Sequence, residues 1–141
     1  QHSFYQLLHQ GTDIIPLQFV GFKNSQMGTD VVIEGSTSQQ KLNANVVAQI
    51  VAFACGKDDT NLNKKFDGGR PSSIIIGEQL DPKAVGALLS HFENKIMFQG
   101  FVWNLNSFDQ EGVQLGKVLA KKVLAHDTDG ALKVYSDLLN I

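Results

Sequence analysis

The sequence predicts an α/β layered fold, because two apolar, β-favouring segments alternate with amphipathic helical segments along 141 residues. The β-favouring segments are residues 14–20 and residues 73–76. Helical periodicity is expected at residues 38–55 and again from residue 81 onward. Two strong strands are too few for a complete parallel sheet, so the chain is expected to be a fragment of a larger protein.

The N-terminal part is expected to hold a short helix followed by a strand. Residues 3–10 have the character of a helix end, and Gly11 takes the usual C-terminal position. The β-favouring segment 14–20 contains a proline, which restricts it to an edge or an early position of a strand. Residues 21–37 are rich in glycine, serine, threonine and asparagine and predict a connection, with a short strand at 31–33.

Residues 38–55 form the clearest amphipathic helix of the chain. Its apolar residues at three- and four-residue spacing are Leu42, Val46, Val47, Ile50, Val51 and Ala54. Cys55, the only cysteine, excludes an internal disulfide and is expected to be a small buried side chain in a reduced, cytosolic setting. Gly56 ends the helix, and residues 57–70 predict a polar surface loop.

The second half of the chain is expected to be mainly helical. The β-favouring segment before it is continuously apolar and β-branched, which predicts a strand buried on both faces. Asp81 and Pro82 open a helix as N-cap and first helical residue. Its apolar stripe consists of Val85, Leu88, Leu89, Phe92 and Ile96. Gly100 predicts a break or kink, and further helices are expected at 109–124 and 130–140.

Composition excludes several classes of function. A net charge of −2, with scattered basic residues, gives no reason to expect nucleic acid or an anionic membrane as partner. No apolar run reaches the ~18 residues that span a bilayer, and no signal peptide is recognisable. The hydrophobic fraction of 43% and charged fraction of 18% are ordinary for a globular protein.

The segment 100–117, GFVWNLNSFDQEGVQLGK, carries the clearest chemical signal. Ser107 and Gln110 have the spacing of a helix capping box. Gln110 and Lys117 are seven residues apart, so they share a helix face with their Cα atoms roughly 10.5 Å apart along the axis. The residues that flank Lys117 are Val113, Ala120 and Leu124. Such surroundings favour a lysine at a cleft, and the alternatives are a snorkelling surface lysine and a Gln110 that only caps the helix.

This segment resembles the C-terminal signature of the glucose-6-phosphate isomerase family: glycine, two apolar residues, a spacer, then Phe-Asp-Gln-x-Gly-Val-Glu-x-x-Lys. Gln114 stands where the family has glutamate, which removes a negative charge there. Residues 1–12, QHSFYQLLHQGT, are similar to the family's Gly-Gln-His-x-Phe-Tyr-Gln-Leu-x-His-Gln-Gly-Thr. Residues 70–73 and 91–96 also resemble family segments in the right order. The likeness covers nearly the whole chain and is weakest at 21–70.

The resemblance implies roles for three residues by position. His2 corresponds to the catalytic histidine that opens the sugar ring and is contributed across a dimer interface. Lys117 corresponds to the lysine that assists ring opening, and Gln110 to a glutamine that contacts the substrate. These roles make chemical sense. Ring opening moves a proton between the anomeric hydroxyl and the ring oxygen of the sugar, and a histidine that titrates near neutrality can carry that proton. A cation beside the oxygen stabilises the developing negative charge.

The resemblance also implies the fold and the activity of the parent protein. Residues 1–141 would be its C-terminal portion: part of a three-layer αβα sugar-isomerase (SIS-like) domain with a parallel sheet, plus C-terminal helices. The implied activity is reversible isomerisation of glucose 6-phosphate and fructose 6-phosphate in glycolysis and gluconeogenesis, by a cytoplasmic homodimer without cofactor or metal. The family's catalytic glutamate and phosphate-binding loop lie upstream of the matched segments, so the chain alone is expected to be inactive.

Two other classes of function are compatible with the residues. One is a non-catalytic regulator that binds sugar phosphates on a related fold. The other is an independent helical interaction domain, motivated by the apolar surface that a truncated core would expose. Gln110 and Lys117 favour the enzyme, because they belong to the catalytic signature. The remaining histidines, His9, His91 and His126, are assigned to packing, capping or the helix dipole.

Overall fold

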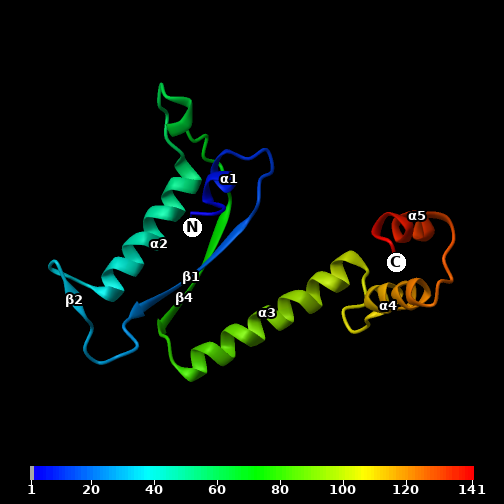
Figure 1. Cartoon of the computed structure of the whole chain (residues 1–141). Coiled ribbons are helices and arrows are strands. Elements are labelled where there is room, and N and C mark those ends of the chain that lie inside the picture. Colours follow the sequence, from blue (N-terminus) through cyan, green and yellow to red (C-terminus); the bar gives the residue numbers. More distant parts are fainter. Residues whose placement is uncertain (1) are drawn as a thin grey trace. The chain divides into compact units, whose positions relative to one another are not determined.

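The computed structural model describes residues 2–141, which form two compact units. The first unit extends to Ser90 and combines strands and helices (Figure 1). The second begins at His91 and is helical. The division falls within the helix α3, Pro82–Trp103. No helix in the described part of the chain combines the length and apolar character needed to cross a membrane.

The first unit is built on two parallel strands. Strands β1 (Leu17–Asn24) and β4 (Ser72–Gln79) lie side by side along their whole lengths (Figure 1). Helix α2 (Ser38–Cys55) connects them in the chain and packs on β1, as in a βαβ crossover. The predicted α/β class with a parallel sheet is therefore confirmed. The first strand begins after Pro16 rather than before it, because proline has no N–H to donate to a strand ladder.

The start of α2 is determined by a hairpin and a capping box. Strands β2 (Val32–Ile33) and β3 (Ser36–Thr37) are antiparallel, and both residues between them have positive φ, as a type I′ turn requires. The Thr37 hydroxyl accepts a hydrogen bond from the N–H of Gln40 (3.1 Å), and the N–H of Thr37 donates to Gln40 Oε1 (2.8 Å). These two bonds satisfy N–H groups at the start of α2 that have no intrahelical partner.

Replacing Thr37 by alanine should destabilise the protein by about 1 kcal/mol, the usual cost of losing an N-cap side chain. Chemical denaturation of the wild type and Thr37→Ala measures this difference. Ser38→Ala is the matched control, because Ser38 is the first helical residue and its side chain takes no part in the capping box. Equal losses in the two variants would contradict the capping role of Thr37.

The core of the first unit lies at the C-terminal end of α2. Phe53 is fully buried, and the ring of Tyr5 from α1 (Tyr5–Gln10) packs edge-on against it. The predicted apolar stripe of α2 is largely wrong: Leu42, Val47 and Val51 are 60%, 59% and 53% exposed. These residues stay exposed because the sheet has two strands and α2 packs mainly on one of them, β1. Cys55 is exposed as well, contrary to its predicted burial.

Strand β4 also differs from its prediction. The apolar run was expected to be buried on both faces, yet Ile74 and Ile76 are 41% and 59% exposed. A strand of a parallel sheet is buried when helices cover both faces and strands lie on both sides. In this sheet β4 pairs only with β1, so its side chains keep much of their exposure.

In the second unit, the break predicted at Gly100 is absent. Helix α3 continues to Trp103, and Gly100 is buried within it. A Cβ atom at Gly100 would lie 2.0 Å from the hydroxyl oxygen of Ser107. The N–H of Leu105 donates to the Gly100 carbonyl at 2.8 Å. The glycine therefore permits the loop after α3 to fold back against the helix. The predicted Ser107 cap is not formed, because Gln110 is the N-cap residue of the next helix.

Gly100→Ala should destabilise the protein by about 1–3 kcal/mol, the usual cost of overpacking a filled site. The sign of this stability change is informative, because alanine in place of glycine at an unobstructed helix position normally stabilises a protein by about 0.5–1 kcal/mol. Gly86→Ala in the same helix is the control, since a Cβ atom at Gly86 would meet open space. Thermal unfolding of both variants checks the contrast, and a stabilised Gly100→Ala would contradict it.

Two further helices complete the second unit. Helix α4 spans Glu111–Leu124 and helix α5 spans Gly130–Leu139, close to the predicted ranges. The two helices contact one another. Ser136 is buried in α5, and its hydroxyl donates to the carbonyl of Leu132 at 2.8 Å. The predicted C-terminal helices are therefore confirmed.

Candidate functional site

His2 lies in an exposed turn that leads into α1. Phe4 stands at the N-cap position, and its ring packs against that of Tyr5 with the ring centroids 5.2 Å apart. Tyr5 in turn packs against Phe53, with ring centroids 5.4 Å apart. The position of His2 therefore depends on how firmly the short helix after it is held.

The C-terminal end of α1 is held by side chains from the loop that follows α2. Arg70 Nη2 donates to the carbonyls of His9 (3.0 Å) and Gly11 (2.9 Å), and Arg70 is only 9% exposed. Gln10 Nε2 donates in the opposite direction, to the carbonyl of Lys65 at 2.9 Å. Sequence reasoning assigned Arg70 no role. The available signal was its place in one of the segments that resemble the isomerase family.

His9 serves as a packing residue, as predicted. Its ring stacks on Phe53 with centroids 3.9 Å apart, and it also contacts the ring of Phe66. Burial and, to a lesser extent, the positive charge of Arg70 lower the pKa of His9 below the ordinary 6.5. The neutral imidazole is therefore the form that fits beside Phe53 and the Arg70 guanidinium.

This lowered pKa predicts a loss of stability on the acid side. As pH falls through about 6.5, His9 becomes protonated in the unfolded chain, while in the folded chain it stays neutral to lower pH. The unfolded state then binds more protons, so the free energy of unfolding falls as pH drops below about 6.5. His9→Phe keeps the stacking and removes the titration. Unfolding curves between about pH 8 and pH 5 should show a shallower acid-side loss in this variant, and identical slopes would contradict the prediction.

Gln110 immediately precedes α4, and Lys117 lies within it. Gln110 is the N-cap residue, but its side chain makes no capping hydrogen bond, and its carbonyl accepts from the N–H of Gln114 at 2.9 Å. The spacing of Gln110, Gln114 and Lys117 places them along one face of the helix. Lys117 is exposed and forms no ion pair within residues 2–141. Within residues 2–141, therefore, Gln110 makes no capping bond and Lys117 makes no ion pair.

The structure does not test the predicted grouping of His2 with Gln110 and Lys117. His2 belongs to the first unit, whereas Gln110 and Lys117 belong to the second. Among the described residues, no group of three or more histidine, cysteine or acidic side chains could hold a metal ion. The assignment of His2, Gln110 and Lys117 to catalysis and substrate binding therefore remains a prediction.

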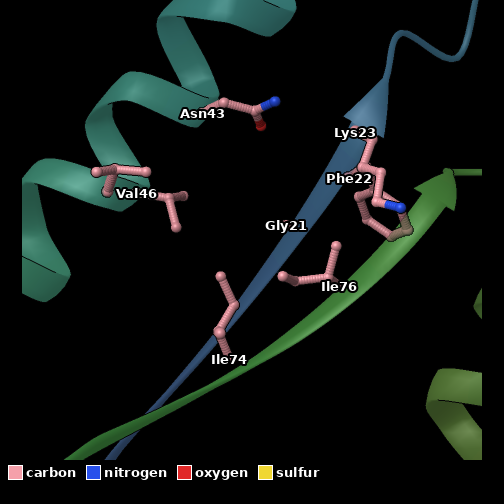
Figure 2. A pocket seen from close by; sticks show the side chains of 8 residues that line it. Gly21, Phe22, Lys23, Asn43, Val46, Ile74 and Ile76 are labelled. Atoms are coloured by element: carbon pink, nitrogen blue, oxygen red, sulfur yellow. The ribbon is translucent and has the colours of Figure 1, made fainter.

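An apolar groove of about 200 Å³ lies between α2 and the sheet of the first unit. Figure 2 shows Asn43 and Val46 of α2 on one side and Ile74 and Ile76 of β4 on the other. The full lining is Gly21, Phe22, Lys23, Asn43, Val46, Val47, Ile74 and Ile76. Its one charged residue, Lys23, is paired with Glu78. The groove lacks convergent polar groups and contains none of the predicted site residues, so it offers packing surface rather than chemistry.

Comparisons with known proteins agree on one family. A family model described as "Phosphoglucose isomerase" matches residues 1–137. A glucose-6-phosphate isomerase of Treponema denticola is 70% identical over 139 residues, which cover 99% of this chain and 26% of that protein. The corresponding protein of Treponema pallidum is 64% identical over 141 residues and is covered to the same 26%. The chain thus spans about a quarter of the length of these relatives.

A solved structure supports the fold. The crystal structure of a glucose-6-phosphate isomerase from Chlamydia trachomatis matches 99% of this chain and 27% of its own chain. The sequence identity is 51% and the TM-score is 0.81. At this level of similarity the two chains share the same α/β fold over the matched region.

Proposed function

Because the chain belongs to the phosphoglucose isomerase family, we propose that the protein that contains it interconverts glucose 6-phosphate and fructose 6-phosphate. The observation that carries this proposal is the match of the family model to residues 1–137. The 70% identity to a protein named glucose-6-phosphate isomerase supports it. The proposed substrate is a sugar phosphate, and no cofactor is required, because the reaction moves protons within one molecule.

Residues 1–141 are proposed to be the C-terminal portion of a protein about four times as long. In that protein they would form part of a three-layer αβα, SIS-like domain followed by C-terminal helices. The exposed apolar side chains of Ile76 on β4 and Val51 on α2 support this arrangement, because further elements of the domain would cover them. The complete protein is proposed to act as a cytoplasmic homodimer in glycolysis and gluconeogenesis.

The proposed chemistry begins with ring opening. His2 takes the proton from the C1 hydroxyl and returns it to the ring oxygen, which breaks the bond between C1 and that oxygen. The Lys117 ammonium stabilises the negative charge that develops on the oxygen, and the Gln110 amide positions the sugar by hydrogen bonding. The later proton transfer between C1 and C2 requires a base, and the family resemblance assigns it to a glutamate outside this chain. The Lys117 side chain is exposed and has no ion pair within residues 2–141, which supports its part in this scheme.

The test is isomerase turnover by the complete protein with glucose 6-phosphate, measured beside the 141-residue chain. The complete protein should form fructose 6-phosphate, and the isolated chain should show no appreciable turnover because it lacks the base and the phosphate-binding loop. A complete protein that binds sugar phosphates without turnover would instead indicate a regulator. Turnover by the isolated chain would contradict the proposed division of the active site.

A further inference from the structure

We propose that Arg70 is a positioning residue for His2: its guanidinium holds the C-terminal end of α1 and thereby the turn that carries His2. This inference rests on the proposed function, since it assigns Arg70 an effect on the ring-opening step. Arg70 itself is not proposed to touch the substrate. Its side chain is almost entirely removed from solvent by the fold of the first unit.

Arg70 is firmly attached to the end of α2. Its backbone N–H donates to the carbonyl of Phe53 at 3.0 Å, and the N–H of the preceding Gly69 donates to the carbonyl of Ala54 at 2.8 Å. These carbonyls lie in the last turn of α2, where helix carbonyls lack partners within the helix. The backbone of Arg70 therefore has a fixed place relative to α2 and Phe53.

From this place the side chain reaches the end of α1. Its Nη2 atom donates to the carbonyls of His9 and Gly11 at 3.0 and 2.9 Å. Hydrogen bonds from a charged donor are the stronger kind, and a cation at a helix C-terminus also complements the helix dipole. Two such bonds from a buried guanidinium fix the helix end in position and direction.

Helix α1 needs an external anchor because it is short. It has six residues, none of them buried, and a helix of this length is not stable by itself. Its other attachments include the ring contacts of Tyr5 and His9 with Phe53, the contact of His9 with Phe66, and the hydrogen bonds of Gln10. Arg70 is the only one of these anchors that carries a charge and bonds to the α1 backbone. Loss of Arg70 should therefore free the segment that contains His2.

The catalytic consequence follows from the geometry of proton transfer. A general acid or base must approach the reacting oxygen to about 2.6–3.2 Å. A displacement of about 1 Å can lower a rate by roughly 100-fold. Arg70→Ala in the complete protein should accordingly lower kcat about 10- to 100-fold while KM changes much less. Arg70→Lys should recover part of this loss, because lysine keeps the charge but cannot reproduce the planar fork.

Two controls separate positioning from a general loss of stability. Thr37→Ala weakens the same unit through the start of α2 without touching α1, so its kcat should equal that of the wild type. In a His2→Ala background, Arg70→Ala should lower kcat by less than about threefold, because a residue that acts through His2 has nothing left to position. A full further loss in the double variant would overturn the proposal.

Amide hydrogen exchange tests the anchor independently of activity. In Arg70→Ala, the amides of Leu8 and Gly11, which donate to Phe4 and Leu7, should exchange faster, while those in the middle of α2 keep their protection. Unchanged exchange in α1 would overturn the anchor itself. A wild type without turnover would overturn the proposed function and the effect of Arg70 on it. A failure of the anchor and a failure of the proposed function are distinguishable, because the first is measured by hydrogen exchange and the second by turnover.

Discussion

Replacing Lys117 by methionine in the complete protein is expected to lower kcat by about 100- to 1,000-fold, as loss of one preorganised charge-stabilising group usually does. Methionine roughly keeps the length and helix propensity of the side chain and removes the charge with its N–H donors. Lys117 is exposed and forms no ion pair within residues 2–141, so folding and stability should change little. The loss should therefore appear in kcat and not in the unfolding temperature.

Lys121→Met is the matched control for this prediction. Lys121 is also exposed and lies one turn further along α4, outside the signature segment. Its replacement should leave kcat within about twofold of the wild type, as expected for a surface substitution outside the site. Steady-state kinetics with glucose 6-phosphate measure both variants. Equal kinetics for Lys117→Met and the wild type would refute the role of Lys117 in ring opening and leave it a surface lysine.

Gly56→Ala is expected to destabilise the protein by about 3–5 kcal/mol, the combined cost of backbone strain and overpacking. Gly56 ends α2 with φ +66° and ψ −161°, a conformation that is essentially restricted to glycine. A Cβ atom there would lie 2.1 Å from the carbonyl oxygen of Phe66 and 2.5 Å from the nitrogen of Gly68. These neighbours are backbone atoms, so they cannot move aside as a flexible side chain can.

Gly35→Ala separates the two causes of this loss. Gly35 also has a positive φ, +76°, but a Cβ atom at this position would meet open space. Its replacement should therefore cost only the strain of the left-handed conformation, about 1–2 kcal/mol. Chemical denaturation of the two variants gives the comparison. Equal losses would show that the contact with the 66–68 backbone contributes nothing.

Several elements could be predicted from the sequence because their causes are local. Helix α2 has the predicted bounds, and Asp81 opens α3 as expected, with its carboxylate accepting from the N–H of Ala84 at 2.7 Å. Helical periodicity and capping act over three or four residues, so they can be recognised in a linear sequence. The same is true of the helix that begins after Gln110 and contains Lys117. Membership of the family was also evident from motifs alone.

The tertiary structure decided the features that depend on residues far apart in the chain. Arg70 bonds to carbonyls 59 and 61 residues away, so the loop in which it lies gave no sign of its burial. Gly100 was expected to break α3, but the close approach of Ser107 makes it a packing position. The exposure of Ile76 followed from which strands and helices lie beside β4, and an apolar run alone cannot specify its neighbours. By itself the sequence determined the local elements, the family and the candidate residues, whereas burial and anchoring were decided by contacts that form only when distant segments meet.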